Sequence, residues 1–206
     1  MGSDVDFAKL WESNVPGVEL FRAQLFNHVF AKHMHETYTI GLNHGGQGSF
    51  IYRGEVRCTY PKSFNLLNPG EAHTGQATSD AGWHYCNLYI SVPLVKQLLA
   101  QLGLQSQSLP YFLEPVVSGQ SLQIYFCKLF QALGESASQL EQQSLMLKFF
   151  SQILRKYAKP RYHLCTIKPE TKAIACVRDY LEAHYAENIT IETLAELVGL
   201  NPLATS

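Results

Sequence analysis

The sequence has no excess of charge of either sign. Its 206 residues include 16 basic and 17 acidic side chains, so the formal net charge is -1 and the pI is near 6.7. Proteins that attract nucleic acid or anionic membranes over their whole surface carry a marked basic excess. The charge balance therefore supplies no whole-molecule attraction to either partner, which counts against a complete DNA-binding protein.

Long apolar runs are also missing. No stretch reaches the roughly 18 apolar residues that a membrane-spanning helix needs. The start, Met1–Asp6, has no basic residues followed by an apolar stretch, so it does not resemble a signal peptide. Hydrophobic residues make up 46% of the chain and charged residues 16%, which favours a globular protein over a disordered one. We therefore expect a soluble, cytoplasmic protein.

Paired cysteine motifs are absent. The cysteines are odd in number, scattered and never spaced C-x-x-C: Cys58, Cys86, Cys127, Cys165 and Cys176. This pattern indicates reduced thiols rather than a disulfide framework or a zinc knuckle. The simplest interpretation is that they are small buried hydrophobic side chains.

The chain has two halves with different patterns. Between residues 7 and 90, short apolar segments alternate with turns rich in glycine and proline, which predicts an all-β sandwich or barrel. The clearest hairpin joins Gly48–Tyr52 to Val56–Tyr60 through a turn with a glycine at position 54.

After Ile90 the apolar spacing becomes helical. Helices are predicted from about 93 to 102, 122 to 133 and 138 to 157, and residues 105–119 form a connector across the barrel surface. We expect the 122–133 helix to pack on the barrel or on its neighbour, with a dimer contact as the alternative. On the third helix the predicted apolar face contains Leu140, Ser144, Leu147, Phe149 or Phe150, Leu154 and Tyr157.

The last segment is typical of a helix followed by the start of a helix-turn-helix. One helix begins at Glu170, and a second begins after the N-cap Thr190 and ends at Gly199. The DNA-reading helix of such a motif would begin at Pro202, four residues before the chain stops. From Arg161 onward there are four basic and six acidic residues, whereas DNA affinity requires cations. We therefore expect these 206 residues not to bind DNA specifically.

Three histidines form the first candidate site. His33 and His35 are two residues apart, so on a strand both imidazoles would enter the same cavity. The turn Asn68–His73 supplies a third histidine that a barrel can bring beside them. The alternative is that these are ordinary hydrogen-bonded histidines.

The strand after residue 82 has one aromatic, amphipathic face. Its alternating residues are Trp83, Tyr85, Asn87 and Tyr89. Such a face is typical of a small-molecule cavity, although aromatics filling a barrel core would give the same pattern. Tyr38, Phe50 and Tyr52 carry the same ambiguity.

These motifs resemble a known family. His33–Gly41 resembles the first barrel motif of the cupin superfamily, and in particular of the ligand-binding domain of AraC/XylS-type transcriptional regulators. Phe64–Gly75 resembles the second motif, and the resemblance covers residues 18 to 90. Residues 173–202 resemble the start of that family's C-terminal DNA-binding domain. The resemblance implies an α+β fold: a cupin-like double-stranded β-barrel, then α-helices, ending in a partial helix-turn-helix.

The same resemblance implies a domain order and a set of partners. Residues 1–118 would form the effector-binding barrel with its following helix and connector, 119–160 a helical linker or dimerisation segment, and 168–206 a truncated DNA-binding domain. The expected partners are a small-molecule effector, a second copy in a homodimer and, in the full-length protein, DNA. The candidate ligand-binding residues are His33, His35, Tyr38, Arg53, His73, Trp83 and Tyr85.

A metal is the open question at this site. Metal-binding cupins add a glutamate four or five residues after their H-x-H motif, where this sequence has Thr39 and Ile40. Glu36 would point away from the cavity. The three histidines could still hold a divalent transition metal such as Zn, Ni or Fe with an open position. Alternatively, they bind an organic effector directly, where a carboxylate would suit the histidines and Arg53, or they are purely structural.

The function implied is that of the effector-sensing part of a bacterial AraC-type regulator. Ligand occupancy would bias the arrangement of the helices and the DNA-binding domain. No catalytic residue is expected. Two alternatives are a metal-dependent cupin enzyme and a ligand-free dimerisation module.

Overall fold

The computed structural model describes residues 5–104, 108–135, 137–160, 171–184 and 189–199. Two compact units divide the chain, residues 1–164 and 165–206, and each is described by itself. Among the described residues, no helix is both long and apolar enough to cross a membrane.

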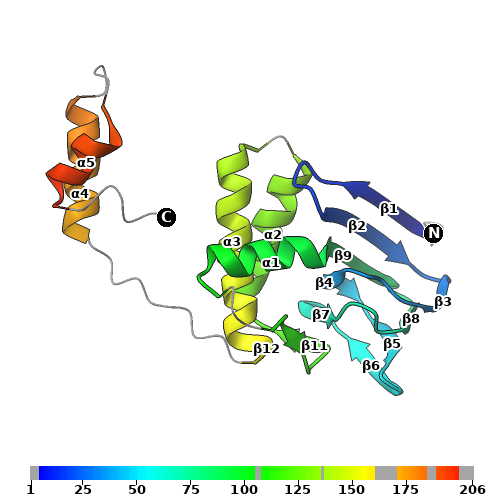
Figure 1. Cartoon of the computed structure of the whole chain (residues 1–206). Helices are drawn as coiled ribbons and strands as arrows, with labels where there is room; N and C mark the ends of the chain where they lie inside the picture. The colour runs from blue at the N-terminus through cyan, green and yellow to red at the C-terminus, as the bar shows by residue number, and fades with distance from the viewer. Residues whose placement is uncertain (1–4, 105–107, 136, 161–170, 185–188, 200–206) are drawn as a thin grey trace. The chain divides into compact units, whose positions relative to one another are not determined.

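Two antiparallel sheets make up most of the first unit (Figure 1). The larger sheet has the order β1-β2-β9-β4-β7-β11 and the smaller one β3-β8-β5-β6. Their strands are β1 (Phe7–Glu12), β2 (Val18–Leu25), β3 (Val29–His33), β4 (Tyr38–Gly46), β5 (Gly48–Tyr52), β6 (Glu55–Thr59), β7 (Ser63–Leu67), β8 (His73–Ala77), β9 (Trp83–Ile90) and β11 (Val116–Ser118). The predicted hairpin is confirmed as β5 and β6. Its turn residues Arg53 and Gly54 both have positive φ, as two-residue hairpin turns require.

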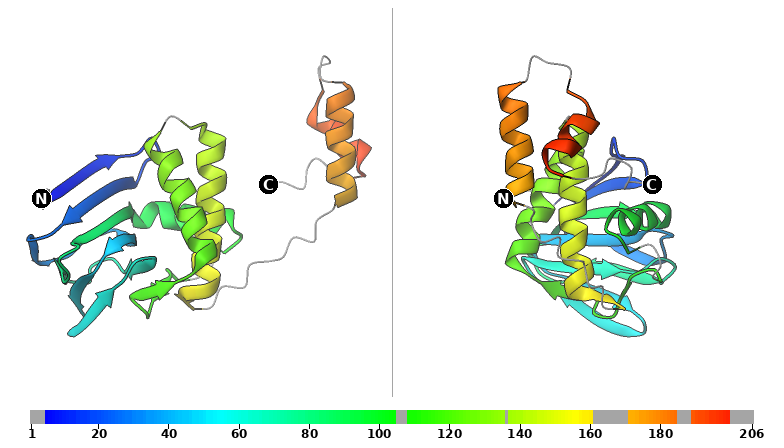
Figure 2. Two further views of the ribbon diagram at one scale, coloured as in Figure 1. Left: turned by 180° about the vertical axis from the view of Figure 1, so that it is seen from behind. Right: turned by 60° about the vertical axis from the view of Figure 1, so that its left-hand side comes forward.

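Three helices cover one face of the larger sheet (Figure 2). They are α1 (Val92–Gln101), α2 (Gln120–Gly134) and α3 (Gln139–Tyr157), close to the predicted bounds. Serine side chains cap α1 and α3. Phe64 from β7 packs edge-on against Phe126 of α2, which also contacts Phe149 of α3. This apolar layer is the core of the unit.

The apolar face predicted for α3 is partly wrong. Leu140 is 74% exposed, and the buried residues are Gln142, Met146, Phe149, Phe150, Ile153 and Leu154. Gln142 is buried because its side-chain amide donates to the carbonyl of Ala132 on α2. A polar residue with an inward hydrogen bond can therefore lie on the packed face, which apolar spacing alone does not reveal.

The predicted connector carries two short strands. Besides β11, which pairs with the edge strand β7, it contains β10 (Tyr111–Phe112). β10 pairs with β12 (Ala158–Lys159), directly after α3. The connector thereby joins the barrel to the point where the chain leaves the third helix.

The cysteines only partly match their interpretation as buried hydrophobic residues. Cys86 is buried, whereas Cys58, Cys127 and Cys176 are exposed; all four are free thiols. Cys165 lies outside the described residues.

The second unit contains two helices, α4 (Thr171–Ala183) and α5 (Ile191–Leu197). Thr190 caps α5 by accepting from the amide of Thr193, and Gly199 after the helix has positive φ, both as predicted. The expected helix start at Pro202 lies outside the described residues. The predicted α+β class is confirmed, with antiparallel sheets followed by helices.

Candidate functional site

Strand register brings one set of polar and aromatic side chains to the inner face of the larger sheet. Opposite residues on neighbouring strands share a face. One row across β2, β9, β4 and β7 is Glu19, Tyr89, Thr39 and Leu67. The next row is Phe21, Asn87, Gly41 and Asn65. A side chain at Gly41 would lie 2.2 Å from Oδ1 of Asn87, so this floor requires a glycine there.

The smaller sheet lies opposite this floor and supplies the histidines. His33 at the end of β3 pairs with His73 at the start of β8. His35 lies just beyond β3, where its carbonyl accepts from the amide of Gly70. The H-x-H motif therefore does not lie in one continuous strand, as the sequence interpretation assumed, and a backbone bond to the 68–73 turn positions its second histidine.

A cavity of about 340 Å³ lies between the two sheets. This volume is within the roughly 300–1,000 Å³ range of small-molecule sites. The lining includes His33, His35, His73, Trp83 and Tyr85 together with Glu19, Phe21, Phe30, Thr37, Thr39, Phe50, Asn65, Asn87 and Tyr89. Two of the candidate ligand-binding residues, Tyr38 and Arg53, are not part of it.

The three histidines, which we call the histidine cluster, have their rings in contact. The ring centroids of His33 and His73 are 4.4 Å apart, and those of His33 and His35 4.9 Å. Nδ1 of His33 lies 2.7 Å from the carbonyl of Ala31, and Nδ1 of His73 3.2 Å from that of Glu71. Because a carbonyl only accepts, both Nδ1 atoms carry the proton, which leaves Nε2 as a lone-pair donor.

The environment favours the neutral form of His35 and His73. Burial, with a smaller contribution from the neighbouring His33 and His35, lowers the pKa of His73 to about 4. Burial and the proximity of His33 also lower the pKa of His35. Neutral imidazoles are the form that accepts hydrogen bonds and binds metal ions.

The histidine cluster fits a divalent transition metal. One ring nitrogen from each histidine lies within 4.8 Å of the others. The Nδ1 bonds to backbone carbonyls are the outer contacts that orient metal-binding histidines. Thr39, at the position of the glutamate in metal-binding cupins, lines the cavity but brings no carboxylate. A metal here would have three neutral ligands and would act as a Lewis acid on a bound molecule.

Arg53 belongs to a different cluster. It forms an ion pair with Glu71 at 2.8 Å and donates to the carbonyls of Phe112 and Leu113, both at 2.9 Å. Its guanidinium also lies over the rings of Tyr52 and Tyr111. With Asn68, these residues form what we call the arginine cluster. Arg53 is therefore occupied in tying the connector to the barrel and cannot act as the carboxylate-binding group of the cavity.

Tyr38 points to the helix side of the larger sheet. It is 2% exposed, and its hydroxyl donates to the carbonyl of Pro110 at 2.8 Å. The next residue, Thr39, is the one that lines the cavity. Strand alternation separates the two, so Tyr38 is a core residue and not a ligand-binding one.

Several lining residues were missed in the sequence. Glu19, Phe21 and Asn65 lie on strands β2 and β7. The residue pattern of these strands does not show which face of the sheet lines the cavity. Asn87 and Tyr89 were recognised as part of an amphipathic face but were not included among the site residues. Asn87 and Tyr89 could have been found from their spacing, since they lie two and four residues after Tyr85 on β9 and therefore share its face.

Comparisons with known proteins identify the family of the chain. The model of the family described as the AraC-like ligand binding domain matches residues 15–150 of the 206, and the chain therefore belongs to this family.

Among individual relatives, an uncharacterized HTH-type transcriptional regulator of Bacillus subtilis (strain 168), YbfI, is 24% identical over 182 residues. The match covers 88% of this chain and 66% of that protein, so the chain spans just under two thirds of its relative's length.

Solved structures are similar in fold. The AraC-like transcriptional activator CuxR matches with a TM-score of 0.53 and 14% identity, covering 94% of this chain and 70% of its own. A Cupin 2 conserved barrel domain protein from Salinispora arenicola matches with a TM-score of 0.39 and 16% identity, covering 48% of this chain and 87% of its own.

Proposed function

We propose that the chain is the effector-sensing part of a bacterial AraC-type transcriptional regulator. A small metabolite binds in the cavity between the sheets, and its binding is coupled to DNA recognition by the C-terminal domain of the whole protein. The observation that carries this proposal is the cavity itself: about 340 Å³, lined by the histidine cluster and aromatic rings, within a family of ligand-binding domains.

The sheet offers a direct route for coupling. Tyr89 and Thr39 line the cavity, while their chain neighbours Leu88 and Ile40 are fully buried against the helices on the other face. A ligand that shifts the floor strands must therefore change the packing of α1 to α3. Since α3 ends at β12, immediately before the chain continues to the second unit, occupancy can bias the position of that unit.

The remaining features of the proposal follow from this role. The protein would act in the cytoplasm as a homodimer, with residues 119–160 as the dimerisation segment and DNA as the partner of the whole protein. Residues 1–118 would form the sensing domain and 168–206 the beginning of the DNA-binding domain. The bound molecule would be released unchanged, so no enzymatic activity is expected.

A ligand screen tests the proposal. Thermal unfolding of the chain is measured with sugars, amino acids, amines and aromatic acids, and product formation is followed by mass spectrometry. A ligand at 100 times its Kd stabilises by about 2.7 kcal/mol, which raises Tm by roughly 5–10 °C.

Two variants make the screen specific to the cavity. Tyr89→Ala removes a lining ring and should abolish the rise in Tm, whereas Tyr60→Ala, at an exposed tyrosine, should preserve it. Stabilisation without turnover supports the sensor. Turnover would support the enzyme alternative, and the absence of any response would support a ligand-free module.

A further inference from the structure

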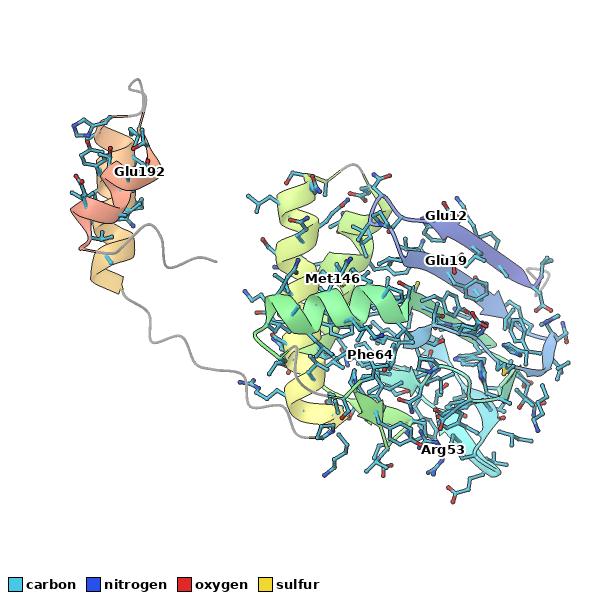
Figure 3. The ribbon with its side chains drawn as sticks, in the orientation of Figure 1. Glu12, Glu19, Arg53, Phe64, Met146 and Glu192 are labelled. Atoms are coloured by element: carbon cyan, nitrogen blue, oxygen red, sulfur yellow. The ribbon has the colours of Figure 1, made fainter. Side chains whose placement is uncertain are left out.

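Charged residues are segregated across the outer two strands of the larger sheet. In β1 and β2, Lys9 lies opposite Arg22 and Glu12 opposite Glu19. Arg22 and Lys9 face the helix side, where both line a groove with Phe130 of α2. Glu12 and Glu19 come from the neighbouring strands β1 and β2 (Figure 3), and their register places them on the face of Phe21, which is the cavity face. The cavity side therefore has the negative charge and the helix side the positive charge.

The two carboxylates have no positive partner. No ion pair joins Glu12 or Glu19 to a lysine, arginine or histidine in the described part of the chain. Like charges directly opposite each other on two strands destabilise a sheet. Glu19 is half-buried in the cavity wall, and the described lining contains no lysine or arginine. A positive charge in the cavity would relieve this repulsion.

Aromatic rings surround the same end of the cavity. The ring of Phe21 lies 5.8 Å from that of Tyr85 and 6.2 Å from that of Tyr89. Tyr89 is the direct cross-strand neighbour of Glu19. The faces of such rings attract ammonium groups, with a contribution of about 0.5–2 kcal/mol each.

Two buried amides add unused acceptors. Asn65 and Asn87 are 6% and 8% exposed, and Oδ1 of each has no hydrogen-bond partner in the described structure. Both residues line the cavity, on either side of Gly41. The amide nitrogen of Asn87 already donates to the hydroxyl of Tyr89 at 3.3 Å. Buried acceptors without partners are costly, so the bound molecule is expected to bring hydrogen-bond donors.

We propose that the ligand of this cavity is a small organic ammonium ion, with Glu19 as its counter-ion and Phe21, Tyr85 and Tyr89 around its charged end. The ammonium N–H groups supply the donors that Asn65 and Asn87 lack. This inference rests on the proposed function, because it names the chemical class of the effector. A carboxylate or phosphate is disfavoured, since it would meet Glu19 and no lysine or arginine in the described lining of the cavity.

Ligands matched in size and different in charge test the proposal. Isothermal titration of the chain, dialysed against a chelator so that no divalent ion adds positive charge, is carried out with phenethylamine, 2-phenylethanol and 3-phenylpropionate. The series is repeated with aliphatic amines, alcohols and carboxylates of equal length. In each set the amine is expected to bind at least 10-fold more tightly than the alcohol, and the carboxylate most weakly.

Two charge-neutralising variants locate the effect. Glu19→Gln should lower amine affinity at least 10-fold and leave alcohol affinity within about 2-fold, because only the ion pair is removed. Glu36→Gln is the control, since Glu36 is exposed and follows His35 directly without lining the cavity. It should change neither affinity, although it removes the same charge close to the site.

The possible outcomes separate this inference from the proposed function. If alcohols or carboxylates bind as tightly as the amines, the cavity is a ligand site but the ammonium assignment is wrong. If amines bind and Glu19→Gln has no effect, the counter-ion assignment is wrong. If no member of any series or of the larger screen binds, both proposals fail.

Discussion

Two polar clusters meet at the turn before β8, and they differ in how their hydrogen-bonding groups are used. Glu71 belongs to the arginine cluster and His73, two residues later, to the histidine cluster. Glu71 accepts from the side chains of Arg53, Tyr52, Asn68 and Tyr111. His33 and His73 each place Nδ1 against a backbone carbonyl, and one ring nitrogen from each of the three histidines lies within 4.8 Å of the others.

The difference separates a structural network from a binding site. Burial by itself would raise the pKa of Glu71, but the hydrogen bonds from its four partners outweigh burial and lower the pKa to about 2. In the histidine cluster, burial acts without a compensating opposite charge, and the pKa values of His35 and His73 fall. A satisfied network stabilises the fold, whereas a cluster whose ring nitrogens lie close together in the lining of a cavity is available to a ligand or metal.

The largest expected effect is the loss of the arginine cluster. Arg53→Met removes the ion pair with Glu71, the side-chain donor to the carbonyl of Leu113 and one of two side-chain donors to the carbonyl of Phe112, and should lower the free energy of unfolding by about 3 kcal/mol. Urea unfolding measures this change. Arg57→Met, at a more exposed arginine paired with Glu55, should cost less than about 1 kcal/mol. Equal losses of unfolding free energy in the two variants would show that the arginine cluster stabilises the fold no more than an exposed ion pair does.

The next effect is a pH dependence that comes from the histidine cluster. The pKa of His73 is about 4 in the folded protein and 6.5 in the unfolded chain, so the unfolded state binds more protons between these values. Stability is therefore lost as pH falls from 6.5 to 4, by about 2 kcal/mol, and is fully present above pH 7.

Unfolding at several pH values in the presence of chelator checks this loss. His73→Gln should flatten the dependence, whereas His28→Gln, at an exposed histidine, should keep it. A wild-type protein equally stable at pH 4.5 and 7 would contradict the expected burial of a neutral imidazole.

Metal affinity gives a further contrast between the clusters. Zn²⁺ binding, measured by competition with a chromophoric chelator, should weaken roughly 100-fold in His33→Gln because one of three ligands is lost. His44→Gln, on the helix side of the sheet, should bind as the wild type does. Arg53→Met should also keep its Zn²⁺ affinity. If the wild type binds Zn²⁺ only with a Kd above about 1 mM, the histidine cluster is not a metal site and serves an organic ligand instead.

The smallest expected effect concerns Tyr38. Tyr38→Phe removes the hydrogen bond to the carbonyl of Pro110 and should cost about 1 kcal/mol in unfolding free energy. Cavity ligands and Zn²⁺ should bind with unchanged affinity. A change in either affinity would show that Tyr38 contributes to the binding site, contrary to its position on the helix side of the strand.

Much of the fold could be predicted from the sequence because its signals are local. Turn glycines and the change from short alternating segments to helical spacing placed the hairpin at residues 53–54 and the helices α1 to α3. The H-x-H motif and the turn before His73 also identified the histidine cluster, although His35 lies beyond the strand.

Only the tertiary structure decided which face of a sheet each side chain points to and which residues it contacts. In the sequence, Arg53 and Tyr38 look like ligand-binding residues. In the structure, Arg53 donates hydrogen bonds to the connector, and strand alternation points Tyr38 to the helix side of the sheet. Conversely, Glu19 and Asn65 become cavity residues only because β2, β9, β4 and β7 align in one register. Local chemistry determines which elements form, whereas the pairing of distant strands determines which of their residues meet.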